Sequence, residues 1–252
     1  MILLAFVVFP AGAEFRTFTS DFGDSVDAKL VELKESGSIV TIELRSGRQI
    51  DARVTAFSQN DQKFIRKWWA AIQAEKQLLK EDSRITVSAK MNRKSQSNHY
   101  DNWYSIDDET KSYFPEVVIE NAELDAFKGN TVRVVVVADD RHNEGQKLIV
   151  SATTVKADFP DRGKVVLETD PFRLRLYEYD SSSSNYNYEY GYEYSGYIVV
   201  IQNSAGKITH TRASKTKYLS NMEVVLSCEA GEMYDESLNR KLNVSPSSYF
   251  VR

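Results

Sequence analysis

Short segments of alternating apolar and polar residues, separated by turn residues, run through almost the whole chain, whereas only one segment has helical periodicity. Between residues 14 and 54 the turns come about every ten residues, at 21–24, 34–37 and 46–48. After residue 82 roughly seven to nine further strand candidates follow, bounded by Gly, Asn and Asp. We therefore predict a mainly β protein, in which a small β barrel closed by one helix precedes a β-sandwich.

The single helical segment begins near Ser58, which is a favourable N-cap residue and has an acid, Asp61, three positions later. Apolar residues then recur at helical spacing, with Ile65 widening the stripe. The spacing puts Trp68 in the core and leaves Trp69, one position further round the helix, partly exposed. The recurring apolar residues are Phe64, Trp68, Ala71 and Ile72. A charged stretch at 76–82 ends the helix, and we place the domain boundary after residue 80.

The second domain, residues 81–252, is predicted to be an immunoglobulin-like β-sandwich, because its strands are short and turns separate them. A short helix capped by Ser214 is expected within residues 213–221. The predicted strands are 84–90, 116–120, 131–138, 148–154, 164–168, 172–176, 197–202, 207–212 and 222–226.

Composition excludes several classes of function. The chain has 252 residues, with 32 Lys and Arg against 36 Asp and Glu, and its net charge of −4 is spread without long blocks, which disfavours nucleic acid as a partner. A single Cys excludes an internal disulfide. No phosphate loop, dinucleotide fingerprint or nucleophile elbow occurs, so we expect no enzymatic activity and no cofactor. The densest acidic group is Asp139, Asp140, His142 and Glu144, whose spacing fits neither an EF-hand nor a zinc site, so no metal is expected.

The N-terminus carries an apolar run at residues 2–9, followed by Pro10 and an Ala-Gly-Ala step at 11–13. This pattern is typical of a signal peptide, although the basic segment that normally precedes the run is missing, so the true start is expected upstream or was shortened. The run is far shorter than the ~20 residues that span a bilayer, so no membrane span is predicted. We expect an exported protein, periplasmic, cell-surface or secreted, beginning at Glu14; the alternative is a buried first strand.

Tyrosine is concentrated in one segment, which holds 8 of the 14 Tyr residues between positions 177 and 197. In a strand, a spacing of two would place five of these rings on one face, as a surface for a peptide, a sugar or another protein. The alternative is a low-complexity insertion at 180–196 between two strands. The five tyrosines are Tyr186, Tyr188, Tyr190, Tyr192 and Tyr194.

Several stretches of the first domain resemble the SLA one homology domain, over about residues 14–70. They are FRTFTSD at 15–21, Gly23, VDAKLV at 26–31, VTI at 40–42, SGRQI at 46–50 and FSQNDQKFI at 57–65. The resemblance implies an SH3-like β fold closed by a helix. In endocytic adaptors such a module binds a short Asn-Pro-Phe-x-Asp peptide, and similar modules occur in exported bacterial proteins. Residues 51–53, Asp-Ala-Arg, depart from the short apolar-Pro step that the family usually carries there.

The peptide's acidic residue would need a basic partner, and Arg45, Arg48 and Arg53 flank the third turn. The alternative is that these side chains form a solvated rim. The sequence thus predicts a non-enzymatic scaffold protein that binds a peptide or protein partner through its first domain. The alternative function is carbohydrate or surface binding through the Tyr-rich edge of the second domain.

Overall fold

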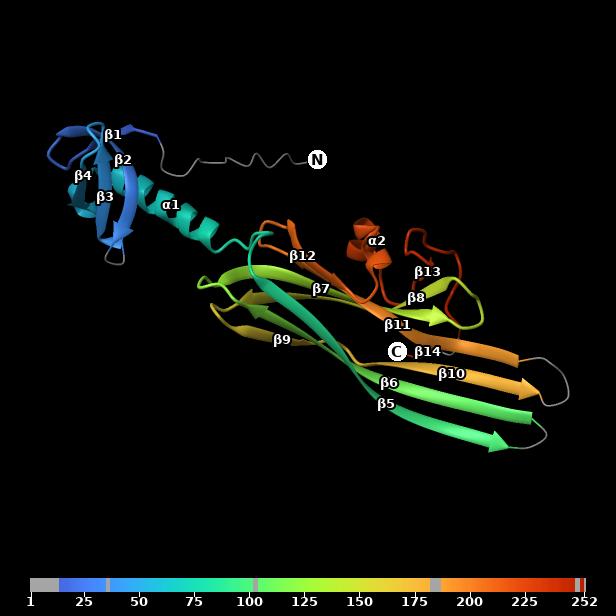
Figure 1. The fold of residues 1–252 in the computed structure, drawn as a ribbon. Helices are drawn as coiled ribbons and strands as arrows, with labels where there is room; N and C mark the ends of the chain where they lie inside the picture. The colour runs from blue at the N-terminus through green and yellow to red at the C-terminus, as the bar shows by residue number, and fades with distance from the viewer. Residues whose placement is uncertain (1–13, 35–36, 102–103, 182–186, 248–249, 252) are drawn as a thin grey trace. The chain divides into compact units, whose positions relative to one another are not determined.

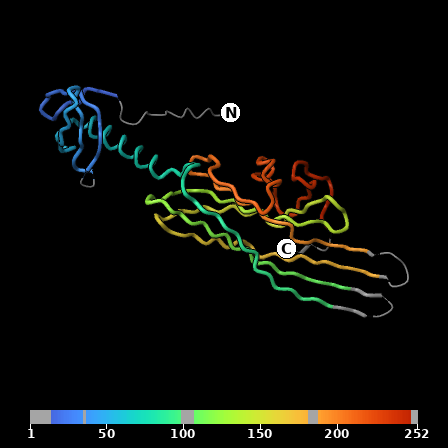
Figure 2. Tube along the Cα trace, viewed as in Figure 1, coloured from blue at the N-terminus to red at the C-terminus, as the bar shows by residue number. Residues whose placement is uncertain are grey.

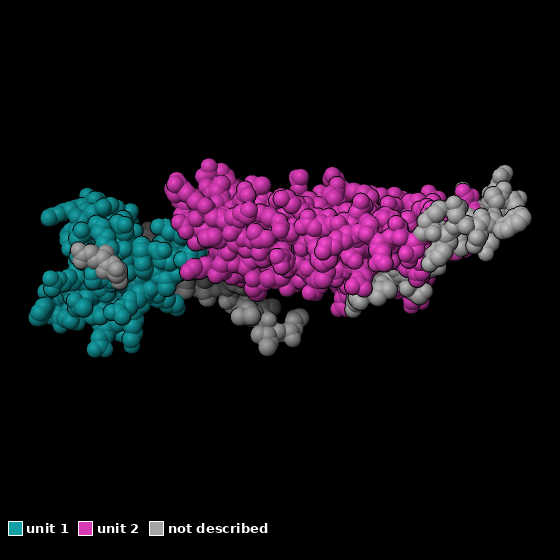
Figure 3. Space-filling view, turned by 90° about the horizontal axis from the view of Figure 1, so that it is seen from below, with its two compact units in different colours: residues 1–77 teal, residues 78–252 magenta. Residues whose placement is uncertain are grey.

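The computed structural model describes residues 14–34, 37–101, 104–181, 187–247 and 250–251. The segment proposed as a signal peptide, residues 1–13, and Tyr186 lie outside the described residues. The fold is mainly β, with two sheets (Figure 1). It divides into two compact units, Met1–Gln77 and Leu78–Arg252, which are coloured separately in Figure 3. The boundary expected from the sequence lay after residue 80.

The first unit is an open antiparallel sheet with the strand order β1-β2-β3-β4. In the residues described, β1 and β4 do not pair with each other, so the closed barrel expected from the sequence does not form. The apolar face of the sheet is instead buried against α1, Gln59–Lys76, and the 3-10 helix η2, Val54–Ala56. The strands are β1 Arg16–Thr19, β2 Ser25–Lys34, β3 Ile39–Leu44 and β4 Gln49–Arg53.

The N-terminus of α1 is fixed by the cap that the sequence predicts. The Asp61 backbone N–H donates to Ser58 Oγ at 3.3 Å. The buried Asp61 carboxylate accepts from the Thr19 backbone N–H at 2.9 Å and from Arg16 Nη2 at 2.7 Å. One carboxylate therefore joins the helix to strand β1, and its burial is compensated by charge and hydrogen bonds.

The apolar face of α1 centres on Ile65, which is 0% exposed. Trp68 and Trp69 are both half-buried and flank it, so Trp69 is partly exposed as predicted, whereas Trp68 is not fully buried in the core. The face of α1 that contacts the sheet follows positions i, i+3, i+4 and i+7, counted from Ile65. Trp68 at i+3 and Trp69 at i+4 therefore lie on either side of the centre of that face. The helical spacing was correct, but the predicted face was rotated by one residue.

We expect Ile65→Ala to lower the free energy of unfolding by about 2–5 kcal/mol, because it opens a cavity in a fully buried site. Ile72→Ala removes the same atoms from a half-buried position on the same helix, so it should cost less than half as much. Urea unfolding of the full chain, followed by tryptophan fluorescence, measures both effects. Equal losses would show that Ile65 is not the centre of the helix contact.

The second unit contains the remaining strands and two short helical segments. Seven strands follow the order β13-β8-β7-β11-β10-β6-β5, while β12 pairs with β11, β14 with β10 and β9 with β6. Figure 2 traces the path of the chain through these elements in the view of Figure 1. The elements are β5 Ile85–Asp101, β6 Tyr104–Asn121, β7 Phe127–Asp140, β8 Gln146–Phe159, β9 Lys164–Glu168, β10 Phe172–Ser181, β11 Asn187–Gln202, β12 Ile208–Ala213, η3 Thr216–Leu219, α2 Met222–Ser227, β13 Met233–Asp235 and β14 Phe250–Val251.

Strand β11 connects two layers of this unit. Its first residues, up to Gly191, pair with β10, and from Tyr192 onward it pairs with β7. The layer containing β6 then packs on the layer containing β7 and β11. Val117 and Ile119 belong to the same buried cluster as Val132 and Val199. The result is sandwich-like, with one strand shared between the two layers.

The central parts of strands β7 and β11 are buried on both faces. Val135 and Ile198 belong to a second cluster with Tyr218 and Val225, which come from η3 and α2. Double burial explains the continuous apolar runs at 134–138 and 197–201, because a strand covered on both sides has no polar face.

The helical segments that pack on this sheet, η3 and α2, differ from the prediction in two respects. Residues 222–226, expected to be a strand, lie in α2, which is capped by Asn221 Oδ1 accepting from the Val224 backbone N–H at 3.3 Å. The Asn cap outweighs the β-branched residues of a very short segment. A short helix does occur within 213–221, but Ser214 does not cap it; Ser214 Oγ accepts from the Tyr197 backbone N–H at 3.0 Å.

Strands β5, β6 and β10 are much longer than expected, and β11 begins ten residues earlier than predicted. Residues 85–101 pair with residues 105–121 along their whole length. We call the four-stranded part formed by residues 92–101, 104–114, 172–181 and 187–191 the arm; its strands run side by side in Figure 1.

Candidate functional site

The outer face of the arm carries the candidate site. The opposite, inner face is apolar where Tyr113 stacks on Phe172 with ring centroids 4.9 Å apart. On the outer face, strand register places side chains in rows that cross the strands, and successive rows are ~7 Å apart. From the base of the arm, the rows are Lys94, Ser112 and Arg173; then Gln96, Thr110 and Arg175; then Asn98, Asp108, Tyr177 and Tyr190; and then Tyr179 and Tyr188.

Four tyrosines on this face, which we call the tyrosine row, lie on two neighbouring strands. Tyr177 is opposite Tyr190 and Tyr179 is opposite Tyr188. The rings of Tyr188 and Tyr190 stack at 6.2 Å, and those of Tyr179 and Tyr188 lie 6.5 Å apart. His142, from the turn between β7 and β8, stacks on Tyr190 at 4.6 Å. Tyr188 is 45% exposed, so the row offers aromatic surface to solvent.

The predicted single face of five tyrosines is divided in two by Gly191. Tyr192 is only 2% exposed and belongs to the inner cluster that contains Phe172. Tyr194 also packs inward, 5.5 Å from the ring of Tyr113. Gly191 has φ +111°, a conformation that L side chains rarely adopt, and this backbone turn breaks the alternation on which the prediction rested.

The tyrosine row is held by neighbours on the other face of the same strand. Arg141 Nε donates to Glu189 Oε2 at 2.7 Å, and Arg141 also pairs with Glu193 at 3.4 Å. The Arg141 backbone N–H donates to the Gly191 carbonyl at 3.0 Å. These bonds tie β11 to the turn after β7 on both sides of Gly191, so the row is part of a preorganised surface.

A salt bridge crosses the middle of the outer face. Arg175 Nε and Nη2 donate to the two oxygens of Asp108 at 2.7 and 2.6 Å. These hydrogen bonds lower the pKa of the Asp108 carboxyl below its usual value. The pair is therefore ionised and internally neutralised, and it presents polar groups without net charge.

The three arginines predicted for the first unit do not form one cluster. Arg45 lies just after β3 and pairs with Asp27 at 3.2 Å. Arg48 is exposed in the same turn, whereas Arg53 ends β4 opposite Ile39, at the other end of the sheet. Phe22, which is 94% exposed, lies in the turn between β1 and β2, at the same end of the sheet as Arg48.

A second polar cluster in the second unit resembles a nucleophile with its base but is closed. Ser195 Oγ lies 2.8 Å from both Lys215 Nζ and the Tyr218 hydroxyl. Ser195 is 8% exposed and Tyr218 is fully buried. Burial would raise the pKa of Asp139 beside them, but hydrogen bonds from Lys147 and Ser195 outweigh it and lower the pKa. The cluster thus joins η3 to β11, and its buried hydroxyl is out of reach of a substrate.

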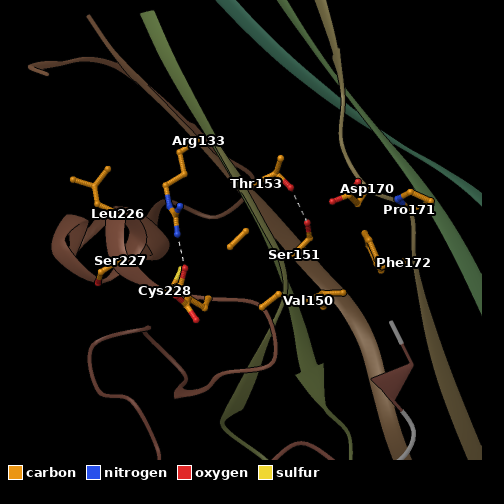
Figure 4. A pocket seen from close by; sticks show the side chains of 13 residues that line it. Arg133, Val150, Ser151, Thr153, Asp170, Pro171, Phe172, Leu226, Ser227 and Cys228 are labelled. Carbon is orange, nitrogen blue, oxygen red and sulfur yellow. Dashed lines mark hydrogen bonds between the residues drawn. The ribbon is translucent and has the colours of Figure 1, made fainter. Parts of the chain in front are cut away.

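A groove of about 740 Å³ lies beside α2 (Figure 4). Its most prominent charged group, Arg133, donates to the Val225 carbonyl at 2.7 Å and to the Cys228 carbonyl, so it caps the C-terminal end of α2. The Cys228 thiol is buried, and burial raises its pKa, so it is not an activated nucleophile.

The acidic group at the turn after β7 has structural partners. Asp139 pairs with Lys147, and Asp140 accepts from the backbone N–H groups of His142 and Asn143. Within the described ranges, no group of three or more His, Cys, Asp or Glu side chains is arranged to hold a metal ion. Among the described helices, none has the length and apolar character needed to cross a membrane.

No family model and no curated protein sequence matches the chain. A crystal structure from Akkermansia muciniphila is similar over 59% of this chain and 80% of that chain, at 16% identity and a TM-score of 0.21. A similarity at that level carries no argument about fold or function.

Gly191→Ala should lower the free energy of unfolding by about 3 kcal/mol or more, because strain at positive φ adds to a steric clash. The added Cβ would lie 2.0 Å from the Arg175 carbonyl oxygen. Gly206→Ala is the matched control, since its φ is +81° but nothing lies within 4 Å of the added atom. It should cost about 1 kcal/mol. Chemical denaturation of both variants tests this difference, and similar losses would contradict the close approach at Gly191.

Proposed function

We propose that this is a non-enzymatic binding protein, exported from the cell, that holds a carbohydrate chain on the outer face of the arm. The observation that carries the proposal is the tyrosine row, which combines the exposed ring of Tyr188 and three half-buried rings with hydrogen-bonding side chains in the next rows. Export itself rests on the N-terminal sequence pattern alone.

The chemistry of the face suits a sugar better than an apolar small molecule. Tyr offers an apolar ring with a polar tip, and Asn98, Gln96 and Thr110 add donors and acceptors beside it. Sugars likewise combine apolar C–H faces with hydroxyl groups at their edges. Apolar small molecules instead prefer enclosed pockets, whereas this face lies along neighbouring strands.

The rigidity of the face also favours binding. Strands position side chains more precisely than loops do. The bonds from Arg141 to Glu189 and Gly191 fix the strand that carries Tyr188 and Tyr190. A ligand would therefore order few side chains on binding, which reduces the entropic cost of association.

Binding of a neutral hexasaccharide, chosen from a glycan array, should weaken at least tenfold in Tyr190→Ala. The reason is the loss of a ring that stacks on both Tyr188 and His142. Phe22→Ala, which removes an exposed ring from the first unit, should leave the affinity within twofold. Isothermal titration calorimetry measures both, and equal weakening in the two variants would place the ligand elsewhere.

A second candidate function is peptide binding by the first unit, as the resemblance to the SLA one homology domain implies. The observation that favours it is the exposed turn of Arg48, at the same end of the sheet as the exposed ring of Phe22. Arg45 is neutralised by Asp27, so Arg48 is the stronger candidate for an acidic peptide residue. As part of the same proposal, we infer that the first unit has an SH3-like fold.

Titration of the full chain with an Asn-Pro-Phe-x-Asp peptide, followed by amide NMR, tests this second function. Arg48→Ala should weaken binding at least tenfold, which corresponds to about 1.4 kcal/mol. Arg53→Ala is the matched control and should change the affinity less than twofold, because Arg53 lies at the other end of the sheet. An absence of shifts at millimolar peptide would reject peptide binding of this kind.

A further inference from the structure

We propose that the outer face of the arm contains a carboxylate subsite formed by Lys94, Ser112 and Arg173, so that its ligand is an acidic glycan chain. This inference rests on the proposed function, since it names the chemical class of the ligand for the same face. It is carried by a depression at the base of the arm and by the charges that line it.

The depression has a volume of about 300 Å³ and lies on the outer face. Register places Lys94 opposite Ser112 and Ser112 opposite Arg173, so the two cations flank one hydroxyl. With strands ~4.8 Å apart, the two cations start from backbone positions ~10 Å apart, which leaves room for an anionic group between them. The lining residues are Lys94, Ser95, Gln96, Thr110, Ser112 and Arg173.

Among the residues that the structure describes, no ion pair compensates the charge of this row. Among the described residues, neither Lys94 nor Arg173 forms an ion pair, and no acidic side chain lines the depression. Arg175, one row further along, is already paired with Asp108. Lys94 lies 5.5 Å from the ring centroid of the exposed Phe114, a contact that leaves its charge available. Two cations without an ion-pair partner among the described residues, in a protein of net charge −4, indicate a local preference for an anion.

The arrangement of donors favours a carboxylate. An Arg guanidinium binds both oxygens of a carboxylate through its planar fork, and Lys adds a point charge. The hydroxyls of Ser112 and Thr110 can donate to the same group or to the sugar ring. Lys94 and Arg173 are exposed, so binding an anion here requires little desolvation.

The distance to the tyrosine row identifies the ligand as a chain. Arg173 and Tyr177 are four residues apart on β10, which corresponds to ~13 Å along the strand. A single sugar cannot contact the depression and the tyrosine row together. An oligosaccharide can place an acidic residue between Lys94 and Arg173 and a later residue against the tyrosine row.

The test compares a galacturonic acid hexasaccharide with its methyl ester, because the ester removes the charge and keeps the sugar chain. Calorimetry with the full chain should show at least tenfold tighter binding of the acid. In the double variant Lys94→Gln, Arg173→Gln this preference should fall below twofold while the affinity for the ester is unchanged. Lys90→Gln, an exposed cation on the same face of β5, is the matched control and should keep the preference.

The outcomes separate this inference from the proposed function. Equal binding of acid and ester by the natural protein would overturn the carboxylate subsite and leave carbohydrate binding standing. A preference that survives in the double variant would also overturn the subsite. Tighter binding of a sulfated galactan hexasaccharide than of the carboxylated one would reject the carboxylate as the anion. If the face binds no saccharide of any kind, the subsite and the proposed function both fail.

Discussion

The second unit depends on one strand that is shared by two layers. Strand β11 hydrogen-bonds β10 with its first residues and β7 with the rest, and Gly191 stands at the change of partner. A side chain there would lie 2.0 Å from the Arg175 carbonyl oxygen and would be strained by φ +111°. The two layers can therefore share a strand only because this residue has no side chain.

The same turn separates structural from exposed tyrosines. Before Gly191, Tyr188 and Tyr190 lie on the outer face of the arm; after it, Tyr192 and Tyr194 fill the space between the layers. The Tyr192 hydroxyl accepts from the Ser247 backbone N–H at 2.8 Å, so its polar tip is satisfied in the core. One run of similar residues thus provides both packing and the candidate binding surface.

Much of the fold could be predicted from local patterns, but the site could not. Ser58 and Asp61 predicted the start of α1 correctly, because a cap is a local interaction. The part of β5 that belongs to the arm, residues 92–101, was not predicted. This part is rich in polar residues and exposed on the outer face of the arm, so it has no apolar alternation to detect. The register of the strands was harder to predict. Lys94 and Arg173 share a row because β5 pairs with β6 and β6 pairs with β10, and the spacing of residues in the sequence does not reveal these pairings. The paired tyrosines on either side of the serine run at 181–184 were the one available sign of a hairpin.

Chemical modification tests the division of the tyrosines at Gly191 most directly. Burial raises the pKa of Tyr194 to about 12, and Tyr192 is almost fully buried, so neither ring should react with tetranitromethane in the folded protein. Tyr188, with 45% of its surface exposed, should be nitrated. Peptide mass spectrometry after brief treatment would assign each site. Modification of Tyr188 with protection of Tyr192 and Tyr194 is the predicted result, and equal nitration of all three would contradict the account.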